Sequence, residues 1–150
     1  MLLCREIVPG MIARRAGRII TVASGAGAQP FPNLSAYVVS KTALIRFSEQ
    51  LAFELAAHGV SVFPIRPGTV RTAMLEESLP HLPFLQEILD RGLEFTPEAV
   101  ARMVLKLASG CADSLSGRMF SVEEDIDAIV RRAEEVGAGE FHVLRLCKLN

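Results

Sequence analysis

The chain has 150 residues, of which 50% are apolar, and its formal net charge at pH 7 is −1. This length suffices for one domain with a buried core, and a near-neutral charge without a basic cluster argues against nucleic acid as a partner. No apolar run reaches the length of a membrane span, and charged residues interrupt the apolar N-terminus too early for a secretory signal.

The cysteines and histidines are scattered along the sequence. Cys4, Cys111 and Cys147 are odd in number and widely spaced, and they show neither metal-ligand spacing nor a redox pair. The three histidines are scattered in the same way. We therefore expect a cytoplasmic protein with reduced thiols and no metal site.

The first predicted strand covers residues 17–24, which are apolar, rich in β-branched side chains and followed by Gly25-Ala26-Gly27. Because it is apolar on both faces, this strand suits the centre of a parallel sheet covered by helices. Ser24 would then lie at the carboxyl end of the strand, where open α/β sheets bind ligands. Alternatively, Ser24 has no role beyond ending the strand.

Tyr37 and Lys41 are four residues apart in a predicted helix over residues 35–58, so their side chains share one face. A cation held beside a phenol favours its ionised form, and such a tyrosine can exchange a proton with a hydroxyl or carbonyl oxygen near neutral pH. A lone Tyr-x-x-x-Lys also occurs by chance, as a half-buried ring beside a solvated lysine. We expect an apolar stripe to fix the rotation of this helix; it consists of Leu44, Phe47, Leu51 and Leu55.

The second predicted strand covers residues 60–65 and is followed by a turn. Pro67 and Gly68 force this turn, and Gly68 allows another backbone to approach closely. Thr72 offers a hydroxyl just beyond the turn, and it is equally suited to cap the next helix.

The order of these features is more specific than any one of them: Ser24 follows one strand, Tyr37 and Lys41 lie on the next helix, and Pro67-Gly68-x-Val70-x-Thr72 follows the next strand. Together they resemble the carboxyl-terminal half of a short-chain dehydrogenase/reductase, over residues 1–122. The resemblance implies an α/β fold, a partial Rossmann-like, doubly wound parallel sheet that contains the last three strands and their flanking helices.

The resemblance also implies a role for each of these residues. Tyr37 would be the catalytic acid/base, Lys41 would assist it and hydrogen-bond the nicotinamide ribose, and Ser24 would orient the substrate oxygen. The residues implied to bind the nicotinamide end of NAD or NADP are Tyr37, Lys41, Pro67, Gly68, Val70 and Thr72. The cofactor supplies the hydride, and the protein supplies position and electrostatics. The implied reaction interconverts a small-molecule alcohol and a carbonyl compound.

The part of the fold that would bind the cofactor's pyrophosphate is not found in the sequence. No Gly-x-x-x-Gly-x-Gly or Gly-x-Gly-x-x-Gly pattern occurs, although a dinucleotide-binding fold opens with a glycine-rich turn. Residues 1–16 resemble the latter part of the helix that precedes the serine strand, so about a hundred residues with the first four strands would be lacking. We therefore expect the isolated chain to be inactive.

Two hypotheses about function remain open. Either the chain is part of an NAD(P)-dependent oxidoreductase, or it is a non-catalytic remnant that acts as a helix-mediated interaction or dimerisation module. The four retained polar residues favour the oxidoreductase; they are Ser24, Tyr37, Lys41 and Thr72. In the resembled family the helices over residues 1–16 and 35–58 form a dimer interface, so the resemblance implies a homo-oligomer.

Residues 73–95 correspond to the mobile lid of the resembled family. Pro80 and Pro83 divide this stretch into short helical pieces. Its apolar side chains would either favour an apolar substrate or pack into the body of the domain; they include Met74, Leu75, Leu79, Leu82 and Phe84.

The rest of the chain contains a further helix, a strand and an appendage. Thr96 and Pro97 begin a predicted helix that reaches Ser109, and residues 115–122 resemble the family's final strand. Residues 123–150 form an appendage to the domain over residues 1–122, with one predicted helix over residues 126–136 that is ended by Gly137-Ala138-Gly139. Residues 140–149 alternate imperfectly, as in a short strand or an extended tail.

Overall fold

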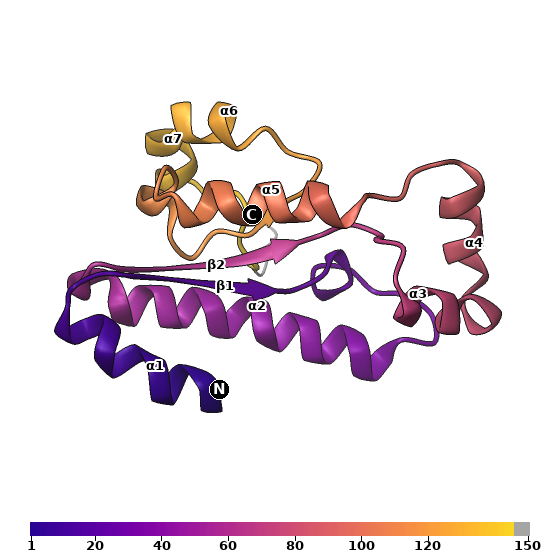
Figure 1. Ribbon diagram of the computed structural model, residues 1–150, viewed down its shortest axis with the longest axis horizontal. Coiled ribbons are helices and arrows are strands. Elements are labelled where there is room, and N and C mark those ends of the chain that lie inside the picture. The colour runs from indigo at the N-terminus through magenta and orange to yellow at the C-terminus, as the bar shows by residue number, and fades with distance from the viewer. Residues whose placement is uncertain (146–150) are drawn as a thin grey trace, which may run out of the picture.

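A computed structural model describes residues 1–145, and these form a three-stranded parallel sheet with helices on both faces (Figure 1). The strands are β1 (Gly17–Val22), β2 (Val60–Arg66) and β3 (Phe120–Ser121), in the order β1-β2-β3. Both pairings are parallel, so the carboxyl ends of the strands share one edge of the sheet. The predicted α/β architecture with three parallel strands is confirmed.

The helices form one layer on each face of the sheet (Figure 1). On one face lie α1 (Leu2–Ala13) and α2 (Ser35–Leu55). On the other face lie α5 (Pro97–Ala108), α6 (Ile126–Arg131) and α7 (Ala133–Ala138). Each layer encloses a hydrophobic core with the central strand β2, which is buried from Val60 to Ile65. The core under α2 contains Ile19, Leu51, Ala52, Leu55, Val60 and Val62.

The first strand of the sheet is β1, and among the described residues its one neighbour is β2. The expectation that residues 17–24 lie at the centre of a sheet stays a prediction. β1 pairs with β2 from Gly17 opposite Val60 to Val22 opposite Ile65. Ile19 is buried in the core under α2. Val22, the last residue of the strand, is 53% exposed.

The long helix α2 is rotated slightly from the predicted orientation. Leu51 and Leu55 are buried as expected, but Leu44 and Phe47 are only half-buried. The face that meets the sheet includes a serine instead: the Oγ atoms of Ser48 and Thr21 lie 2.7 Å apart. Ser48 also donates to the Leu44 carbonyl, so its burial leaves no polar atom unpaired. The helix ends through η2 (Ala56–His58) and the left-handed residue Gly59.

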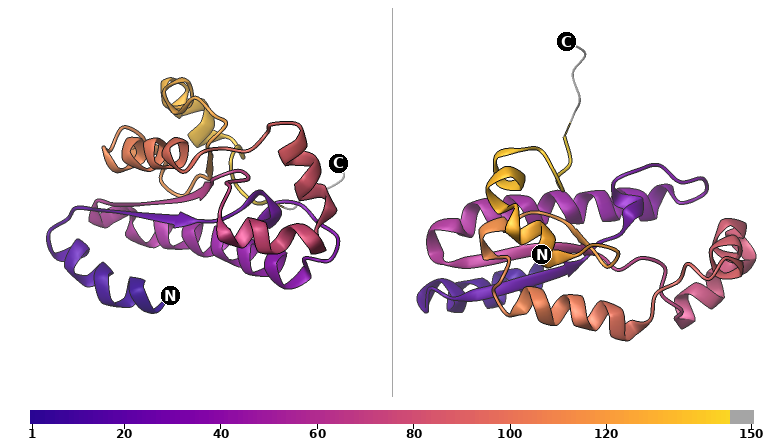
Figure 2. Two further views of the ribbon diagram at one scale, coloured as in Figure 1. Left: turned by 45° about the vertical axis from the view of Figure 1, so that its right-hand side comes forward. Right: turned by 90° about the horizontal axis from the view of Figure 1, so that it is seen from above.

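The connection from β2 to α5 contains three short helical pieces, which are α3 (Ala73–Ser78), η3 (Leu79–His81) and α4 (Pro83–Asp90). They break near Pro80 and Pro83, as predicted. Figure 2 shows this connection beyond the carboxyl ends of β1 and β2. The following helix α5 begins as expected, because Thr96 Oγ1 accepts from the Ala99 N–H at 3.2 Å and Pro97 occupies the first position.

The last third of the chain has more breaks than predicted. The final strand is limited to β3, because η4 (Asp113–Leu115) and a left-handed Gly117 precede it. The predicted helix over residues 126–136 is wrong: two helices, α6 and α7, are separated by Arg132 (φ −107°, ψ 25°).

The C-terminal residues pack against the domain. Ile126 and Val136 are buried in the core formed with Phe63 and Phe120. Residues 140–145 form turns without a regular strand, and the Met119 N–H donates to the His142 carbonyl at 2.9 Å. The end of the predicted strand or tail, residues 146–149, lies outside the described residues. The domain boundary at residue 122 stays a prediction.

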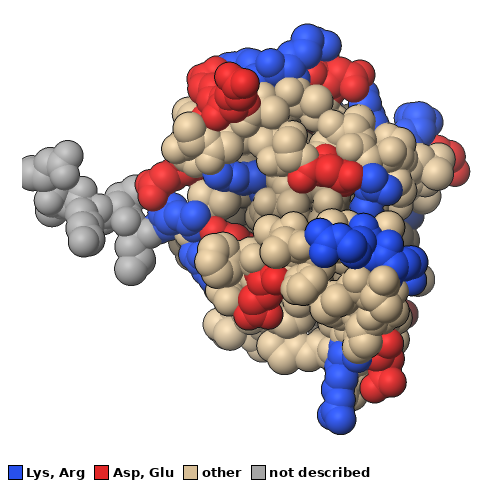
Figure 3. All heavy atoms as spheres, turned by 90° about the vertical axis from the view of Figure 1, so that its left-hand side faces the viewer, with Lys and Arg blue, Asp and Glu red and all other residues tan. Residues whose placement is uncertain are grey.

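The surface carries both signs of charge. On the face in Figure 3, basic and acidic side chains are interspersed among neutral ones. Among the described residues, no helix is both long enough and apolar enough to cross a bilayer.

Candidate active site

Ser24 lies two residues beyond the end of β1, at the carboxyl edge of the sheet. It begins η1 (Gly25–Gly27), and its Oγ accepts a hydrogen bond from the Ala26 N–H at 3.2 Å. A hydroxyl has one donor position besides its acceptor positions, so this bond leaves the O–H able to donate to a ligand. Ser24 thus begins the turn that follows β1 and also presents a donor.

The turn that carries Ser24 is held tightly against α2. A Cβ added to Gly27 would lie 2.8 Å from the Lys41 carbonyl carbon and 2.7 Å from Ile45 Cδ1, so only glycine fits there. Thr42 Oγ1 donates to the Gly27 carbonyl at 2.9 Å. Thr42 was not among the predicted site residues, because no sequence pattern shows that its hydroxyl reaches a turn fifteen residues earlier.

Tyr37 and Lys41 lie on the first two turns of α2, and the Lys41 side chain reaches the carboxyl end of β1. The Lys41 Nζ atom is 5.5 Å from the centroid of the Tyr37 ring, within the range of a cation–π contact. The same ammonium donates to the carbonyl of Val22, the last residue of β1, at 2.8 Å. Tyr37 is 39% exposed, so its phenol is accessible from solvent. The structure therefore brings together the two residues that the spacing placed on one face.

The turn after β2 is also fixed in place. Gly68 has a left-handed backbone (φ 70°). The Phe95 ring packs against it, because a Cβ added to Gly68 would lie 2.5 Å from Phe95 Cδ2. Val70 forms a parallel bridge with Phe95, whose N–H donates to the Thr69 carbonyl at 2.7 Å. Thr72 caps α3, with its Oγ1 accepting from the Leu75 N–H at 3.4 Å. The capping role considered for Thr72 is confirmed, and its O–H remains able to donate.

Arg66 is a polar residue at this edge that the sequence reasoning did not single out. Its Nε donates to Ser121 Oγ at 3.0 Å, and its guanidinium pairs with Glu123. Its side chain also lies against Gly25, because a Cβ on that glycine would be 3.0 Å from Arg66 Cδ. Arg66 therefore connects the carboxyl ends of all three strands. The sequence does contain one indication of this role, which is the position of a charged residue at the end of a mostly apolar strand.

The donors at this edge fit the nicotinamide end of a dinucleotide. Lys41 has three N–H donors, of which one is directed to Val22. The O–H groups of Ser24 and Thr72 add two more donors at this edge of the sheet. Ribose hydroxyls, a carboxamide and a carbonyl substrate all offer oxygen acceptors for such groups. The chain's sequence contains no glycine-rich turn for the pyrophosphate.

Metal ligands do not gather anywhere in the part of the chain that the structure describes. Among residues 1–145, no three His, Cys, Asp or Glu side chains are placed so that they could hold a metal ion.

Comparison with known proteins agrees with this arrangement. The family model for short chain dehydrogenase matches residues 1–82. Dehydrogenase/reductase SDR family member 4 of Bos taurus is 38% identical over 125 residues, which cover 81% of this chain and 44% of that protein. The chain spans about half the length of the curated relatives it matches.

Solved structures match the fold as well. The structure of 4-hydroxyisoleucine dehydrogenase complexed with NADH has a TM-score of 0.70 and 28% identity, over 80% of this chain and 51% of the other. Actinorhodin polyketide ketoreductase with NADPH has a TM-score of 0.68 and 30% identity, over 75% of this chain and 48% of the other. Sequence motifs, fold and family match therefore agree: the chain belongs to the short-chain dehydrogenase/reductase family.

Proposed function

We propose that the chain is the catalytic part of an oxidoreductase that interconverts an alcohol and a carbonyl compound with NAD or NADP. The observation that carries the proposal is the position of Lys41, which is bonded to the end of β1 and lies 5.5 Å from the Tyr37 ring centroid. Ser24 and the Pro67–Thr72 turn lie at the same edge of the sheet. The nicotinamide cofactors in the related structures support the same reaction class.

In this proposal the chain's own residues handle the substrate oxygen and its proton. The Ser24 O–H donates to the carbonyl oxygen and orients it, and Tyr37 transfers its phenolic proton to that oxygen as the carbonyl is reduced. The Lys41 ammonium lies 5.5 Å from the ring centroid, beside the group that transfers the proton. NADH or NADPH, when bound, supplies the hydride. In the reverse direction Tyr37 removes the proton of the alcohol.

The proposal is tested with the protein at its natural length. The intact mass of the protein from its own cells shows whether that length is 150 residues, which corresponds to 16.3 kDa, or more. Carbonyl-dependent oxidation of NADH and NADPH is then followed at that length for the wild type and for Tyr37→Phe. We expect Tyr37→Phe to lower the rate by about 10²–10⁴-fold. Equal rates in the two proteins would exclude Tyr37 as the acid/base.

We expect the 150-residue chain on its own to show no turnover, because it has no glycine-rich turn for the pyrophosphate. Turnover by the purified 150-residue chain that disappears in Tyr37→Phe would contradict this expectation. A cytoplasmic location is part of the proposal and fits Cys4 and Cys111, which are both free thiols.

A homo-oligomer formed through α1 and α2 is the second part of the proposal, and it also fits the alternative of a non-catalytic dimerisation module. These helices expose large apolar side chains, which are Leu2 (79%), Leu3 (79%), Ile7 (42%), Val39 (66%) and Phe53 (80%). Contiguous apolar surface of this kind marks interaction sites, and the exposed side chains of α1 and α2 support one here. We expect Phe53→Glu to shift sedimentation towards the monomer, while Leu105→Glu on α5, at a residue that is 69% exposed, leaves it unchanged. A monomeric wild type would contradict the proposal.

A further inference from the structure

Arg66 is the last residue of the central strand β2, and its side chain contacts the segments that follow both neighbouring strands. Towards β3, its Nε donates to Ser121 Oγ at 3.0 Å, and its guanidinium pairs with Glu123. Towards β1, it lies against Gly25, because a Cβ added to that glycine would be 3.0 Å from Arg66 Cδ and 3.6 Å from Nη1. The Arg66 side chain therefore extends from the end of β3 to the residue that follows Ser24.

The partners of Arg66 on the β3 side are themselves held in place. Ser121 is buried, and its Oγ also accepts from the Glu123 N–H at 3.4 Å. The Ser121 N–H donates to Glu124 Oε2 at 2.7 Å, and the Val122 N–H donates to the Arg66 carbonyl at 3.0 Å. A planar guanidinium that is bonded at two of its nitrogens keeps one orientation. The side chain can thus serve as a fixed support for the residues packed against it.

Ser24 lies between two contacts with the end of β2. Before it, the Ala23 N–H donates to the Ile65 carbonyl at 2.9 Å. After it, Gly25 lies against the Arg66 side chain. The first contact is part of the backbone pairing of the sheet, whereas the second depends on one side chain. A substitution of Arg66 therefore releases the residue after Ser24 without removing the strand pairing before it.

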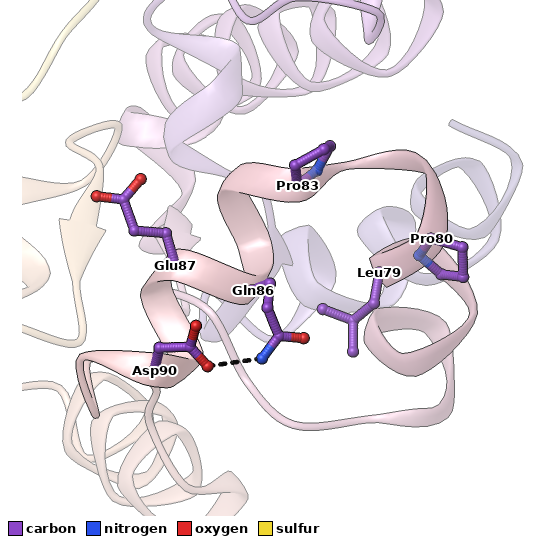
Figure 4. Close-up of a pocket in the computed structure, with 6 residues that line it drawn as sticks. All are labelled: Leu79, Pro80, Pro83, Gln86, Glu87 and Asp90. Atoms are coloured by element: carbon purple, nitrogen blue, oxygen red, sulfur yellow. Dashed lines mark hydrogen bonds between the residues drawn. The ribbon is translucent and has the colours of Figure 1, made fainter.

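The connection after β2 contains a hollow that is separate from this contact. The hollow has a volume of about 580 Å³ and lies between η3 and α4; it is lined by Leu79, Pro80, Pro83, Gln86, Glu87 and Asp90 (Figure 4). Within it, Gln86 Nε2 donates to Asp90 Oδ1 at 2.7 Å. Neither Gly25 nor Arg66 lines this hollow. The hollow therefore gives no support to the residues around Ser24.

We propose that Arg66 is a positioning residue, which holds the Ser24 hydroxyl in place for the substrate oxygen through its contact with Gly25. The inference rests on the proposed function, in which the Ser24 O–H donates to that oxygen. A shift of about 1 Å in a group that orients the reacting atoms can lower the rate by about 10²-fold. Arg66 thus influences turnover without touching the substrate itself.

The first test follows the Ser24 turn without cofactor or substrate. The Ala26 N–H donates to Ser24 Oγ at 3.2 Å, so its hydrogen exchange, measured by NMR on the full chain, reports whether that hydroxyl stays in place. We expect Arg66→Ala to speed exchange at Ala26 relative to Phe63, in the buried part of β2, by about two- to tenfold. Arg66→Lys keeps the aliphatic stem and the charge, so its effect should be smaller. Ser121→Ala removes only the acceptor of the Arg66 Nε and should also have a smaller effect.

Arg18→Ala is the matched control for Arg66→Ala. Arg18 also belongs to a strand and pairs with a carboxylate, that of Asp113, and both arginine side chains are 35% exposed, but Arg18 lies at the amino end of the sheet. Easier global unfolding would speed exchange at Ala26 and Phe63 alike. Arg18→Ala should therefore leave the ratio of the two exchange rates as in the wild type. Far-UV circular dichroism checks that every variant is folded, and if Arg66→Ala does not fold, Arg66→Lys takes its place.

The second test measures kcat/KM at the natural length of the protein. We expect Arg66→Ala to lower kcat/KM by about tenfold, which is less than the loss expected in Ser24→Ala. Arg66→Lys should restore part of the rate, and Arg18→Ala should keep the wild-type rate. In the Ser24→Ala background, Arg66→Ala should cause no further loss, because a residue that acts only through the Ser24 hydroxyl then has nothing to position.

The outcomes separate this inference from the proposed function. An exchange ratio that is unchanged in Arg66→Ala, or changed equally in Arg18→Ala, would overturn the inference. In a protein whose turnover depends on Tyr37, an unchanged kcat/KM in Arg66→Ala would also overturn it, as would a full additional loss of rate in the Ser24→Ala background. If exchange at Ala26 responds as expected but the natural-length protein shows no turnover that depends on Tyr37, Arg66 still positions the Ser24 hydroxyl and the proposed function fails.

Discussion

The amino and carboxyl ends of the sheet treat their polar groups differently. At the amino end, Arg18 of β1 makes two bonds to Asp113, with Nε–Oδ1 and Nη2–Oδ2 distances of 2.8 and 2.5 Å. At the carboxyl end, the oxygens of Ser24 and Thr72 each accept one backbone N–H, and their O–H groups stay available. Charged groups pair at both ends, since Arg66 and Glu123 pair at the carboxyl end, but only the carboxyl end also presents the O–H donors of Ser24 and Thr72 to a ligand.

The connections at the two ends differ in the same way. At the amino end, α2 reaches β2 through η2 and the left-handed Gly59 alone. At the carboxyl end, the chain makes the long excursion from β2 to α5, whose helix α4 has no buried residue. Segments with few buried contacts have low local stability, and binding loops are commonly built from them. These differences support the proposal that the carboxyl end carries the candidate site, and we expect the amino end to contribute mainly to stability.

The largest effect expected from this comparison is the loss of activity in Ser24→Ala. Removing a hydrogen-bond donor to a reacting oxygen lowers the rate by about 10²–10³-fold. We therefore expect such a loss in kcat/KM at the natural length of the protein, with little change in the unfolding midpoint. Ser109→Ala is the matched control, because the Ser109 hydroxyl only donates to the Lys106 carbonyl at the end of α5. An unchanged kcat/KM in Ser24→Ala would mean that the free O–H has no role in the reaction.

A smaller effect, on stability, is expected where the Ser24 turn contacts α2. In Gly27→Ala the new methyl group would lie 2.8 Å from the Lys41 carbonyl carbon and 2.9 Å from its oxygen. Backbone atoms cannot move aside as a flexible side chain can, so we expect a loss of about 1–3 kcal/mol in the free energy of unfolding. Urea unfolding followed by circular dichroism measures it.

Gly137→Ala is the matched control for this change. Nothing lies within 4 Å of a Cβ at Gly137, and the residue is inside α7. Alanine there should raise the free energy of unfolding by about 0.5–1 kcal/mol, because glycine is a poor helix former. If both substitutions had the same effect, the close contact between the turn and α2 would not constrain position 27.

The sequence was sufficient to predict the first two strands along the chain and the polar residues that follow them, because those depend on local patterns. The spacing of Tyr37 and Lys41 placed both side chains on one helical face, and their contact in the structure agrees. Thr96 and Pro97 likewise marked the start of α5. The roles of Ser24, Tyr37 and Lys41 in catalysis stay predictions.

The remaining features depend on contacts between residues that are distant in the sequence. The rotation of α2 follows from the pairing of Ser48 with Thr21, and Phe31 and Phe84 bring two connections of the chain into contact. Neither pair has a local signal. Likewise, an apolar composition does not show which strands are the neighbours of β1, since strand pairing joins residues that are distant in the sequence.

The smallest effect is expected at the amino end, from the ion pair between Arg18 and Asp113. The hydrogen bond from Arg18 lowers the pKa of Asp113 below its ordinary value of 3.8. In the folded state this carboxyl therefore releases its proton more readily than in the unfolded state, so the pair stabilises the fold above pH 4, roughly. That contribution is lost as the pH falls through the lowered pKa. Because the Asp113 side chain is 41% exposed, solvent screens the pair, and we expect Asp113→Asn to cost about 1 kcal/mol at pH 7.

Urea unfolding at pH 7 and at pH 3 tests this assignment. The difference in unfolding free energy between the wild type and Asp113→Asn should be larger at pH 7 than at pH 3. At pH 3 the Asp113 carboxyl of the unfolded wild type takes up a proton, which stabilises the unfolded state and removes part of the contribution of the ion pair. Glu135→Gln is the comparison: its pair with Arg132 is also two-bonded, at 2.8 and 2.6 Å, but it joins neighbouring residues of one segment and no separate elements. Its effect should be smaller than that of Asp113→Asn. If Asp113→Asn lowered kcat/KM but did not change the free energy of unfolding, the amino end of the sheet would contribute to the reaction and not to stability, contrary to the comparison of the two ends.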